Sequence, residues 1–332
     1  MDVLPNKNVL KLGTRGSVLA RMQSGLVANA LERLHPGLKV ELIVYSTSGD
    51  QIVDRPLHEV GGKGLFTKEL EQALLNREVD FAVHSMKDVP VTMPLVSTDA
   101  LVMAAIPQRE DPRDALIAGR AMTLRELPKG AKVGTGSLRR RCQVLALRPD
   151  LVVENIRGNV DTRIRKQAEG QYDAVILAMA GLRRSGLFNA ERMAAIAETE
   201  LLPAAAQGAL ALQCRRDDAR TRTLLGAMNH PPTALCVEAE RAVVMALQGD
   251  CHSPIAALAT IAGNTLTLRA AVGSRDGEPP VIAAESGGPA LDAESITKSV
   301  VASLMQQGVA KMLQSNPAAG LCKHQGKANG SA

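Results

Sequence analysis

The segment KLGTRGS at residues 11–17 and the segment KVGTGS at residues 132–137 share one pattern. In each, a short apolar stretch runs into Gly-Thr, then a small turn, and then a serine that precedes an amphipathic stretch. This order predicts a β-strand, a turn and a helix that begins at the serine. Because each segment opens a strand–helix unit, the sequence predicts two similar domains that face each other across a cleft, and duplication is one explanation.

Strands and helices are expected to alternate over the first two thirds of the chain. Apolar residues recur every three to four positions over 17–34 and 138–147, which predicts helices with one buried face. Apolar and β-branched stretches predict strands at 9–14, 40–47, 81–83, 151–156 and 174–179. Such alternation is typical of an α/β fold with parallel, doubly wound sheets covered on both faces. The strand at 208–214 has no certain place by sequence alone.

The sequence pattern changes after His230-Pro231-Pro232. A helix is expected at 233–247 and another at 292–313, and strands are expected at 255–262, 265–272 and 280–285. This pattern predicts a small α+β third domain. The tail at 316–332 is rich in Gly, Ala, Lys and Ser, and we expect it to be disordered.

Composition limits the class of protein. The chain has 332 residues, 45% hydrophobic and 22% charged, which is typical of a globular protein of more than one domain. No apolar stretch approaches the roughly 20 residues that span a bilayer, and the first residues do not resemble a secretory signal. We therefore expect a cytoplasmic protein with no membrane partner. The five cysteines have no zinc spacing, so neither a disulfide framework nor a metal is expected.

The positive charge is concentrated in one stretch. The chain has a net charge of +5, and residues 139–166 alone hold eight basic residues against three acidic ones. Arginine predominates there, and its planar guanidinium suits carboxylate or phosphate. With two Tyr, three Phe and no Trp, base-stacking surfaces are scarce. The sequence therefore favours small anionic ligands, and no nucleic-acid partner is expected.

Arginines next to the two predicted helix starts indicate anion sites. Ser17 follows Arg15, and Ser137 precedes Arg139 and Arg140. Backbone N–H groups at a helix start attract anions, whereas cations there are unfavourable without one. The alternative is that both serines are ordinary helix caps.

Two further residues stand out by their local context. Asp88 follows a predicted buried strand, where α/β sheets bind ligands, and Lys87 lies beside it. The alternative for this pair is a surface ion pair. Cys251 lies in a loop and is the best candidate for a functional thiol, whereas Cys214 and Cys236 fall in apolar segments typical of packed thiols. No catalytic partner for Cys251 can be assigned by spacing.

Eight segments, taken in order over about residues 9–313, resemble those of the porphobilinogen deaminase (hydroxymethylbilane synthase) family. They are GTRGS at 13–17, GGKGLFTKELE at 61–71, HSMKDVP at 84–90, REDPRD at 109–114, GTGSLRR at 134–140, RGNVDTR at 157–163, AAQGA at 205–209 and the loop around Cys251. Each is weak alone, but eight in register are highly specific.

The resemblance implies a transferase of tetrapyrrole and haem biosynthesis. Such an enzyme joins four porphobilinogen molecules head to tail, with loss of ammonia, and releases 1-hydroxymethylbilane. It builds the chain on a dipyrromethane cofactor, made from its own substrate and held through a thioether by the residue matching Cys251. The family is expected to be monomeric, with two domains like those of periplasmic binding proteins and a small third domain.

The resemblance also implies residue roles and boundaries. Asp88 would be catalytic. The cofactor carboxylates would be held by Lys87, Ser137, Arg139, Arg140 and Arg163, and, as weaker transfers, by Thr135 and Lys63. The incoming pyrrole would be held by Arg15, Ser17, Arg157 and Arg184. The expected domains are 1–104 with 208–226, then 109–202, then 231–315.

Three positions depart from the family pattern: Glu59 in place of Lys, Gly136 in place of Ser, and Asp250 in place of Gly. They put binding details in doubt more than activity. Two rival interpretations remain, a non-catalytic anion-binding module and a nucleic-acid binder whose affinity would fall steeply with salt.

Overall fold

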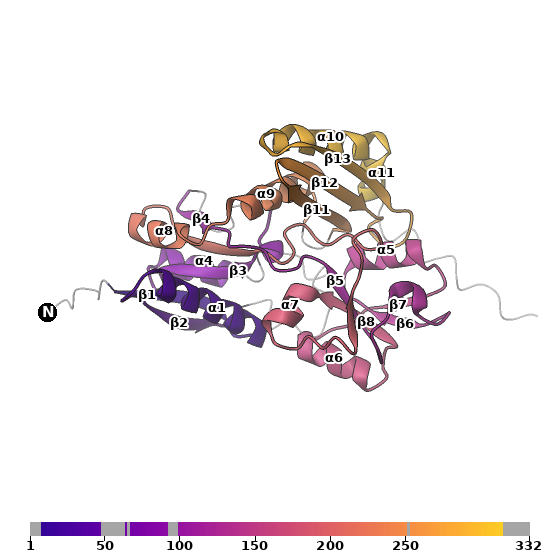
Figure 1. The fold of residues 1–332 in the computed structure, drawn as a ribbon, viewed down its shortest axis with the longest axis horizontal. Coiled ribbons are helices and arrows are strands. Elements are labelled where there is room, and N and C mark those ends of the chain that lie inside the picture. Colours follow the sequence, from indigo (N-terminus) through magenta and orange to yellow (C-terminus); the bar gives the residue numbers. More distant parts are fainter. Residues whose placement is uncertain (1–7, 48–63, 65–66, 92–98, 251–252, 315–332) are drawn as a thin grey trace, which may run out of the picture.

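A computed structural model describes residues 8–47, 64, 67–91, 99–250 and 253–314. The described chain forms three sheets, two with five strands and one with three. In Figure 1 the first domain lies at the left, the second at the right, and the third above them, across their boundary. The predicted disordered tail at 316–332 lies outside the described residues.

The first domain surrounds a sheet with the strand order β2-β1-β3-β10-β4. Strands β1, β2 and β3 are parallel, and β10 runs antiparallel to β3 and β4. Leu12, Phe81 and Leu212 are fully buried in its core. The elements are β1 (Val9–Arg15), α1 (Val18–Leu34), β2 (Lys39–Tyr45), α4 (Lys68–Leu75), β3 (Phe81–Ser85), η1 (Met86–Asp88), β4 (Leu101–Ala105), β10 (Leu210–Arg215) and α8 (Ala219–Gly226).

The second domain repeats this arrangement with the order β7-β6-β8-β5-β9. Strands β6, β7 and β8 are parallel, and β5 is antiparallel to β8 and β9. The elements are β5 (Asp114–Ile117), η2 (Leu124–Glu126), β6 (Lys132–Gly134), α5 (Leu138–Leu147), β7 (Val152–Glu154), α6 (Val160–Ala168), β8 (Ala174–Ala178), α7 (Met179–Arg184) and β9 (Met193–Ala195).

The two repeated segments occupy equivalent places, since β1 and β6 are each the second strand of their sheet. The prediction of two similar α/β domains is therefore confirmed, and each sheet, predicted to be parallel, also contains one strand antiparallel to its neighbours. The chain passes between the two domains twice. After each such crossing, the next strand begins beside the carboxyl end of a parallel strand. Thus Leu210 pairs with Ser85 at the end of β3, and Asp114 pairs with Ala178 at the end of β8. A strand that starts there must run antiparallel.

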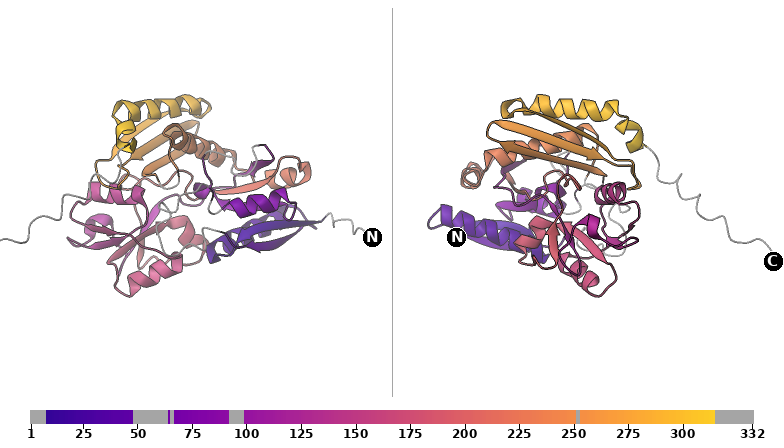
Figure 2. Two further views of the ribbon diagram at one scale, coloured as in Figure 1. Left: turned by 180° about the vertical axis from the view of Figure 1, so that it is seen from behind. Right: turned by 45° about the vertical axis from the view of Figure 1, so that its right-hand side comes forward.

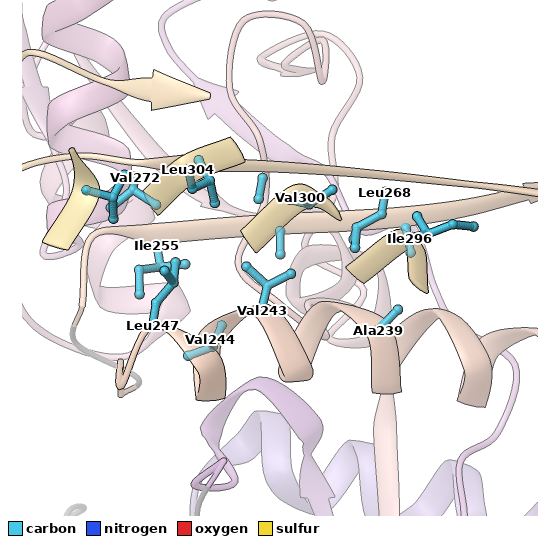
Figure 3. Packing of buried hydrophobic residues seen from close by; sticks show 14 of the residues in the cluster. Ala239, Val243, Val244, Leu247, Ile255, Leu268, Val272, Ile296, Val300 and Leu304 are labelled. Atoms are coloured by element: carbon cyan, nitrogen blue, oxygen red, sulfur yellow. The ribbon is translucent and has the colours of Figure 1, made fainter. Parts of the chain in front are cut away.

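The third domain is an antiparallel three-stranded sheet with helices packed on one face, where they also contact each other. It contains α9 (Pro231–Ala246), β11 (Ile255–Ala262), β12 (Thr265–Val272), β13 (Ile282–Pro289), η3 (Ala290–Asp292), α10 (Ala293–Gln306) and α11 (Val309–Gln314). Figure 3 shows Val243 of α9, Leu268 of β12 and Val300 of α10 meeting in its core, and all three are fully buried. The predicted helix at 292–313 is divided into α10 and α11, because Gly308 adopts a φ of +94°.

The third domain contacts both of the others. The two further views in Figure 2 show it lying over them. Arg241 of α9 binds the segment after β3, and Arg269 of β12 forms a 2.5 Å ion pair with Glu198. Within the described part of the chain, no helix combines the length and the apolar composition that crossing a bilayer requires.

Candidate functional site

A cavity of about 190 Å³ lies where the three domains meet. The first domain contributes Lys87 and Asp88, and the second contributes the start of α5. The third domain and the returning chain complete the wall. Its polar and charged lining residues are Lys87, Asp88, Ser137, Arg139, Arg140, Gln207, Arg241, Asp250 and Ser253. The carboxyl end of β3 thus opens into this cavity, as expected for ligand sites in α/β sheets.

Lys87 and Asp88 form the turn η1 directly after the buried strand β3. The Lys87 Nζ lies 3.4 Å from Oε1 of Gln207. Burial lowers the pKa of Lys87, and the negative charge of Asp88 partly offsets this. The Asp88 carboxylate makes no hydrogen bond or ion pair with any residue that the structure describes, although it lines a cavity rich in cations. It is therefore an acceptor that is available to a ligand.

Asp114 is the anion that Arg139 and Arg140 bind. Its carboxylate is fully buried, at 2.9 Å from Nη2 of Arg139 and 2.7 Å from Nη2 of Arg140. The side-chain amide of Gln207 donates a third hydrogen bond at 2.8 Å. Burial alone would raise the pKa of Asp114, but the two guanidinium charges and these hydrogen bonds hold it far below its ordinary value.

Sequence reasoning overlooked Asp114, although the REDPRD segment ends in it and its strand starts there. An anionic ligand was expected beside the cations at the start of α5, and the structure shows that the buried side chain of Asp114 pairs with two of them. Arg139 also donates to the Leu202 carbonyl, and Arg140 to the Ile176 carbonyl at 2.9 Å. Even so, the Arg140 Nε is buried without a partner, so this side chain retains a donor.

The predicted capping role of the serines is present in the structure. The Ser17 hydroxyl accepts a hydrogen bond from the Ala20 N–H at 3.3 Å, and the Ser137 hydroxyl accepts one from the Arg140 N–H at 3.4 Å. The Thr135 hydroxyl accepts the Ser137 N–H at 3.2 Å. Only Ser137 of these lines the cavity.

Two further arginines, Arg163 and Arg157, lie outside the cavity lining, and Arg163 is in electrostatic contact with Arg140 and Arg157. Arg163 donates through Nε to the Gly158 carbonyl at 2.7 Å. Burial lowers the pKa of Arg163 to about 10, and the charges of Arg140 and Arg157 act in the same direction. The Arg157 Nε is buried without a hydrogen-bond partner. Repulsion among these guanidinium groups indicates a site that a polyanion would stabilise.

Arg15 and Arg184 do not line the cavity. Arg184 donates to the Gly208 carbonyl at 2.7 Å, and burial lowers its pKa while Glu110 opposes that effect. The positive charge of Arg15 reaches His84, whose ring nitrogen Nε2 lies 2.9 Å from Oε1 of Gln213. Burial lowers the pKa of His84 to about 4, so this histidine is neutral near pH 7.

Cys251, Lys63 and Glu59 lie outside the described residues. The neighbours of residues 251–252, Asp250 and Ser253, do line the cavity. Asp250 Oδ1 accepts both the N–H and the hydroxyl of Ser253 at 2.9 Å. Asp250, which stands where the family pattern has Gly, therefore supplies a local hydrogen bond to this loop.

Comparison with known proteins identifies the family. A family model described as "Porphobilinogen deaminase, dipyromethane cofactor binding domain" matches residues 10–223, and the model of the porphobilinogen deaminase C-terminal domain matches residues 234–306. The chain belongs to the porphobilinogen deaminase family. A curated family relative, the porphobilinogen deaminase of Syntrophobacter fumaroxidans, is 48% identical over 307 residues, covering 92% of this chain and 97% of the relative.

Solved structures of binding proteins share a distant likeness. A putative methionine-binding lipoprotein of Bacillus subtilis has a TM-score of 0.41 and 13% identity, covering 68% of this chain and 91% of its own. The aliphatic sulphonate binding protein SsuA of Escherichia coli has a TM-score of 0.38 and 14% identity, covering 92% and 89%.

The residues of the cavity fit the family's cofactor. A dipyrromethane bears several carboxylates, and the cavity presents Lys87, Arg139 and Arg140, with Arg163 and Arg157 in electrostatic contact beyond them. Two buried guanidinium nitrogens, Nε of Arg140 and Nε of Arg157, have no partner. Such donors would gain hydrogen bonds from a carboxylate-bearing group.

Replacing Asp114 by Asn should lower the free energy of unfolding by about 3–5 kcal/mol, because two buried guanidinium groups lose their shared counter-ion. The matched control is Asp217→Asn, which removes the partner of Arg77 from an ion pair whose side chains are 65% and 64% exposed. That change should cost less than about 1 kcal/mol. Denaturant unfolding measures both, and equal losses would contradict the assignment of Asp114 as the central anion.

Stability should fall as the pH is lowered from 6.5 towards 4. The folded state holds the pKa of His84 near 4, below its ordinary value of 6.5, so the unfolded chain binds the extra proton in this window and is favoured. The full effect is about 3 kcal/mol at roughly 1.4 kcal/mol per pKa unit. Denaturant unfolding as a function of pH should show this slope in the parent and a flatter one in His84→Gln. An unchanged slope would exclude His84 as its source.

Proposed function

We propose that the cavity between the three domains is where this chain carries out its family's reaction. That reaction deaminates four porphobilinogen molecules, joins them head to tail and releases 1-hydroxymethylbilane, an activity of tetrapyrrole and haem biosynthesis. The observation that carries the assignment to this cavity is the Asp88 carboxylate, which has no partner among the described residues and lies in a wall of cations.

The cofactor would be attached to Cys251 through a thioether. When bound, a dipyrromethane supplies a free α-carbon as the point of extension, together with several carboxylates. Lys87, Ser137, Arg139, Arg140 and Arg163 would hold those carboxylates, and Thr135 and Lys63 are secondary candidates. In support, Asp250 and Ser253, on either side of residues 251–252, line the same cavity as Lys87 and Arg140.

Asp88 would act on the reacting pyrrole. Its carboxylate can accept pyrrole N–H groups and stabilise the positive charge that develops on the substrate as ammonia leaves. It can also take up or return a proton at the leaving amine and at the α-carbon. Lys87, Arg139 and Arg140 cannot do this, because cations repel a developing positive charge and bind carboxylates instead.

Arg15, Ser17, Arg157 and Arg184 would bind the acetate and propionate groups of the incoming porphobilinogen. Each charge-assisted hydrogen bond contributes roughly 1.5–3 kcal/mol. The unpartnered Nε of Arg157 supports this role most directly. A cytoplasmic location, a monomeric state and the absence of nucleic-acid and membrane partners rest on the family resemblance and composition.

The intact mass of the purified protein should exceed the mass of the sequence by a covalent adduct of two linked pyrroles. Cys251→Ser should lack both this adduct and activity, because the attachment atom is gone. Cys236→Ala, at a buried thiol in α9, is the matched control and should keep the adduct. An active protein of unmodified mass would contradict the assignment of a covalent cofactor at Cys251.

Asp88→Asn should fold, retain the adduct and lose about 10²–10³-fold in kcat, the range found when one charge-stabilising group is removed. Asp292→Asn is the control, since Asp292 is an exposed carboxylate of the third domain with no capping hydrogen bond. It should leave kcat unchanged. The measurement is the rate at which each variant consumes porphobilinogen, after intact mass has confirmed the adduct. Near-normal turnover in Asp88→Asn would remove Asp88 from the mechanism.

A further inference from the structure

Helix α9 of the third domain presents one face to the turn that carries Asp88. Ala234, Val237 and Arg241 are spaced three and four residues apart and therefore share a face of the helix. Val237 is fully buried in an apolar cluster that also contains Met86 and Val89, the residues on either side of Lys87 and Asp88. The Asp88 turn is thus packed against another domain.

Arg241 binds the backbone of this turn one helical turn after Val237. Its Nη1 donates to the Val89 carbonyl at 2.8 Å and to the Met86 carbonyl at 3.3 Å. Its Nη2 donates to the Pro90 carbonyl at 2.7 Å. Burial lowers the pKa of Arg241 to about 10.

The chemistry of the turn explains why it needs such a partner. Carbonyl groups at the end of a short helix are left without N–H partners and carry partial negative charge. Pro90 has no N–H with which to extend the turn. Buried carbonyls without partners are costly, and a planar guanidinium can serve several of them in one geometry.

The preceding residue, Glu240, fixes the same helix to both chain crossings. Its fully buried carboxylate pairs with Arg109 at 2.6 and 2.9 Å and accepts the Ala206 N–H at 2.6 Å. Helix α9 therefore has a fixed position relative to the crossings. A side chain on it can hold the Asp88 turn at a defined place in the cavity.

We propose that Arg241 is a positioning residue, which acts through the backbone of residues 86–90 to aim the Asp88 carboxylate at the reacting pyrrole. This inference rests on the proposed function of Asp88. Arg241 lines the cavity as well, and its Nη1 and Nη2 donate to three carbonyls of the turn, so its guanidinium is placed on the turn. Among the described residues of the positive region, Arg140 and Arg157 each keep a buried Nε without a partner.

The test compares Arg241→Gln and Arg241→Lys with the parent as full-length holoprotein. Arg241→Gln should keep the two-pyrrole adduct by intact mass and lose at least about 10-fold in kcat, because small misplacements of a catalytic group are costly. Its KM for porphobilinogen should stay within about 3-fold of the parent value. Amide hydrogen exchange in the peptide spanning residues 84–91 should become faster. Arg241→Lys keeps the charge but not the planar fork, so it should be intermediate in kcat and exchange.

Arg148→Gln is the matched control. Arg148 binds the carbonyls of Leu124, Arg125 and Leu127 in the second domain, at 2.9–3.0 Å, as Arg241 binds those of its turn. This variant should lose stability yet keep kcat and the exchange of residues 84–91 unchanged. An equal loss of kcat in Arg148→Gln would show that the effect is merely structural and would overturn the proposal.

The outcomes separate the proposal from the function on which it rests. Parent-like kcat in Arg241→Gln, loss of the adduct, a raised KM with unchanged kcat, or unchanged exchange at 84–91 would each overturn the positioning role. If Arg241→Gln fails to fold, the kcat and exchange of Arg241→Lys decide in the same way. A parent protein that does not consume porphobilinogen would instead refute the proposed function, while the exchange measurement still tests whether Arg241 holds the turn.

Discussion

A carboxylate with no exposure to water, Asp114, holds two guanidinium groups at the centre of this molecule. Burying three charges is unfavourable unless each is paired and hydrogen-bonded, and here the geometry meets that condition. Asp114 begins β5 just after one crossing, Gln207 belongs to the other, and Arg139 and Arg140 begin α5. One anion therefore fixes both crossings and the start of the helix that forms the second domain's share of the cavity wall.

The same interaction explains the electrostatics of the cavity. Two cations on one anion leave a positive excess, which Lys87, Arg157 and Arg163 increase. Burial lowers the pKa of Lys87 and of Arg163, and the charge of Arg140 acts on both in the same direction. The two aspartates differ in their hydrogen bonds. The Asp114 carboxylate accepts hydrogen bonds from three side chains and therefore stabilises the structure, whereas the Asp88 carboxylate bonds to none of the described residues and is available for chemistry.

Local patterns in the sequence predicted local structure well. The two Gly-Thr segments lie on the equivalent strands β1 and β6, helix 138–147 has the predicted bounds, and so do β11 and β12. A strand was predicted at 208–214, where β10 lies, but not its antiparallel direction, and β5 was not predicted. The direction of both strands depends on where the chain enters each sheet, which periodicity does not record. The helix break at Gly308 was missed because the apolar period continues across it.

The candidate site was predictable only in part, for a similar reason. Motif spacing and the family resemblance indicated Lys87, Asp88, Ser137, Arg139 and Arg140, and the structure places all five in one cavity. Asp114 and Arg241 were missed, since each acts through partners far away in the sequence. A buried ion pair and a guanidinium on backbone carbonyls leave no periodic signal along the chain.

A crystal structure of the purified protein would show whether the cofactor lies in this cavity. We expect electron density for two linked pyrroles that extends from the Cys251 sulfur into the cavity. Their carboxylates should lie within hydrogen-bond distance of Lys87, Arg140 and Arg163, with Asp114 still paired to Arg139 and Arg140. Pyrrole density on another surface, or a cavity in which both arginines have left Asp114, would contradict this expectation.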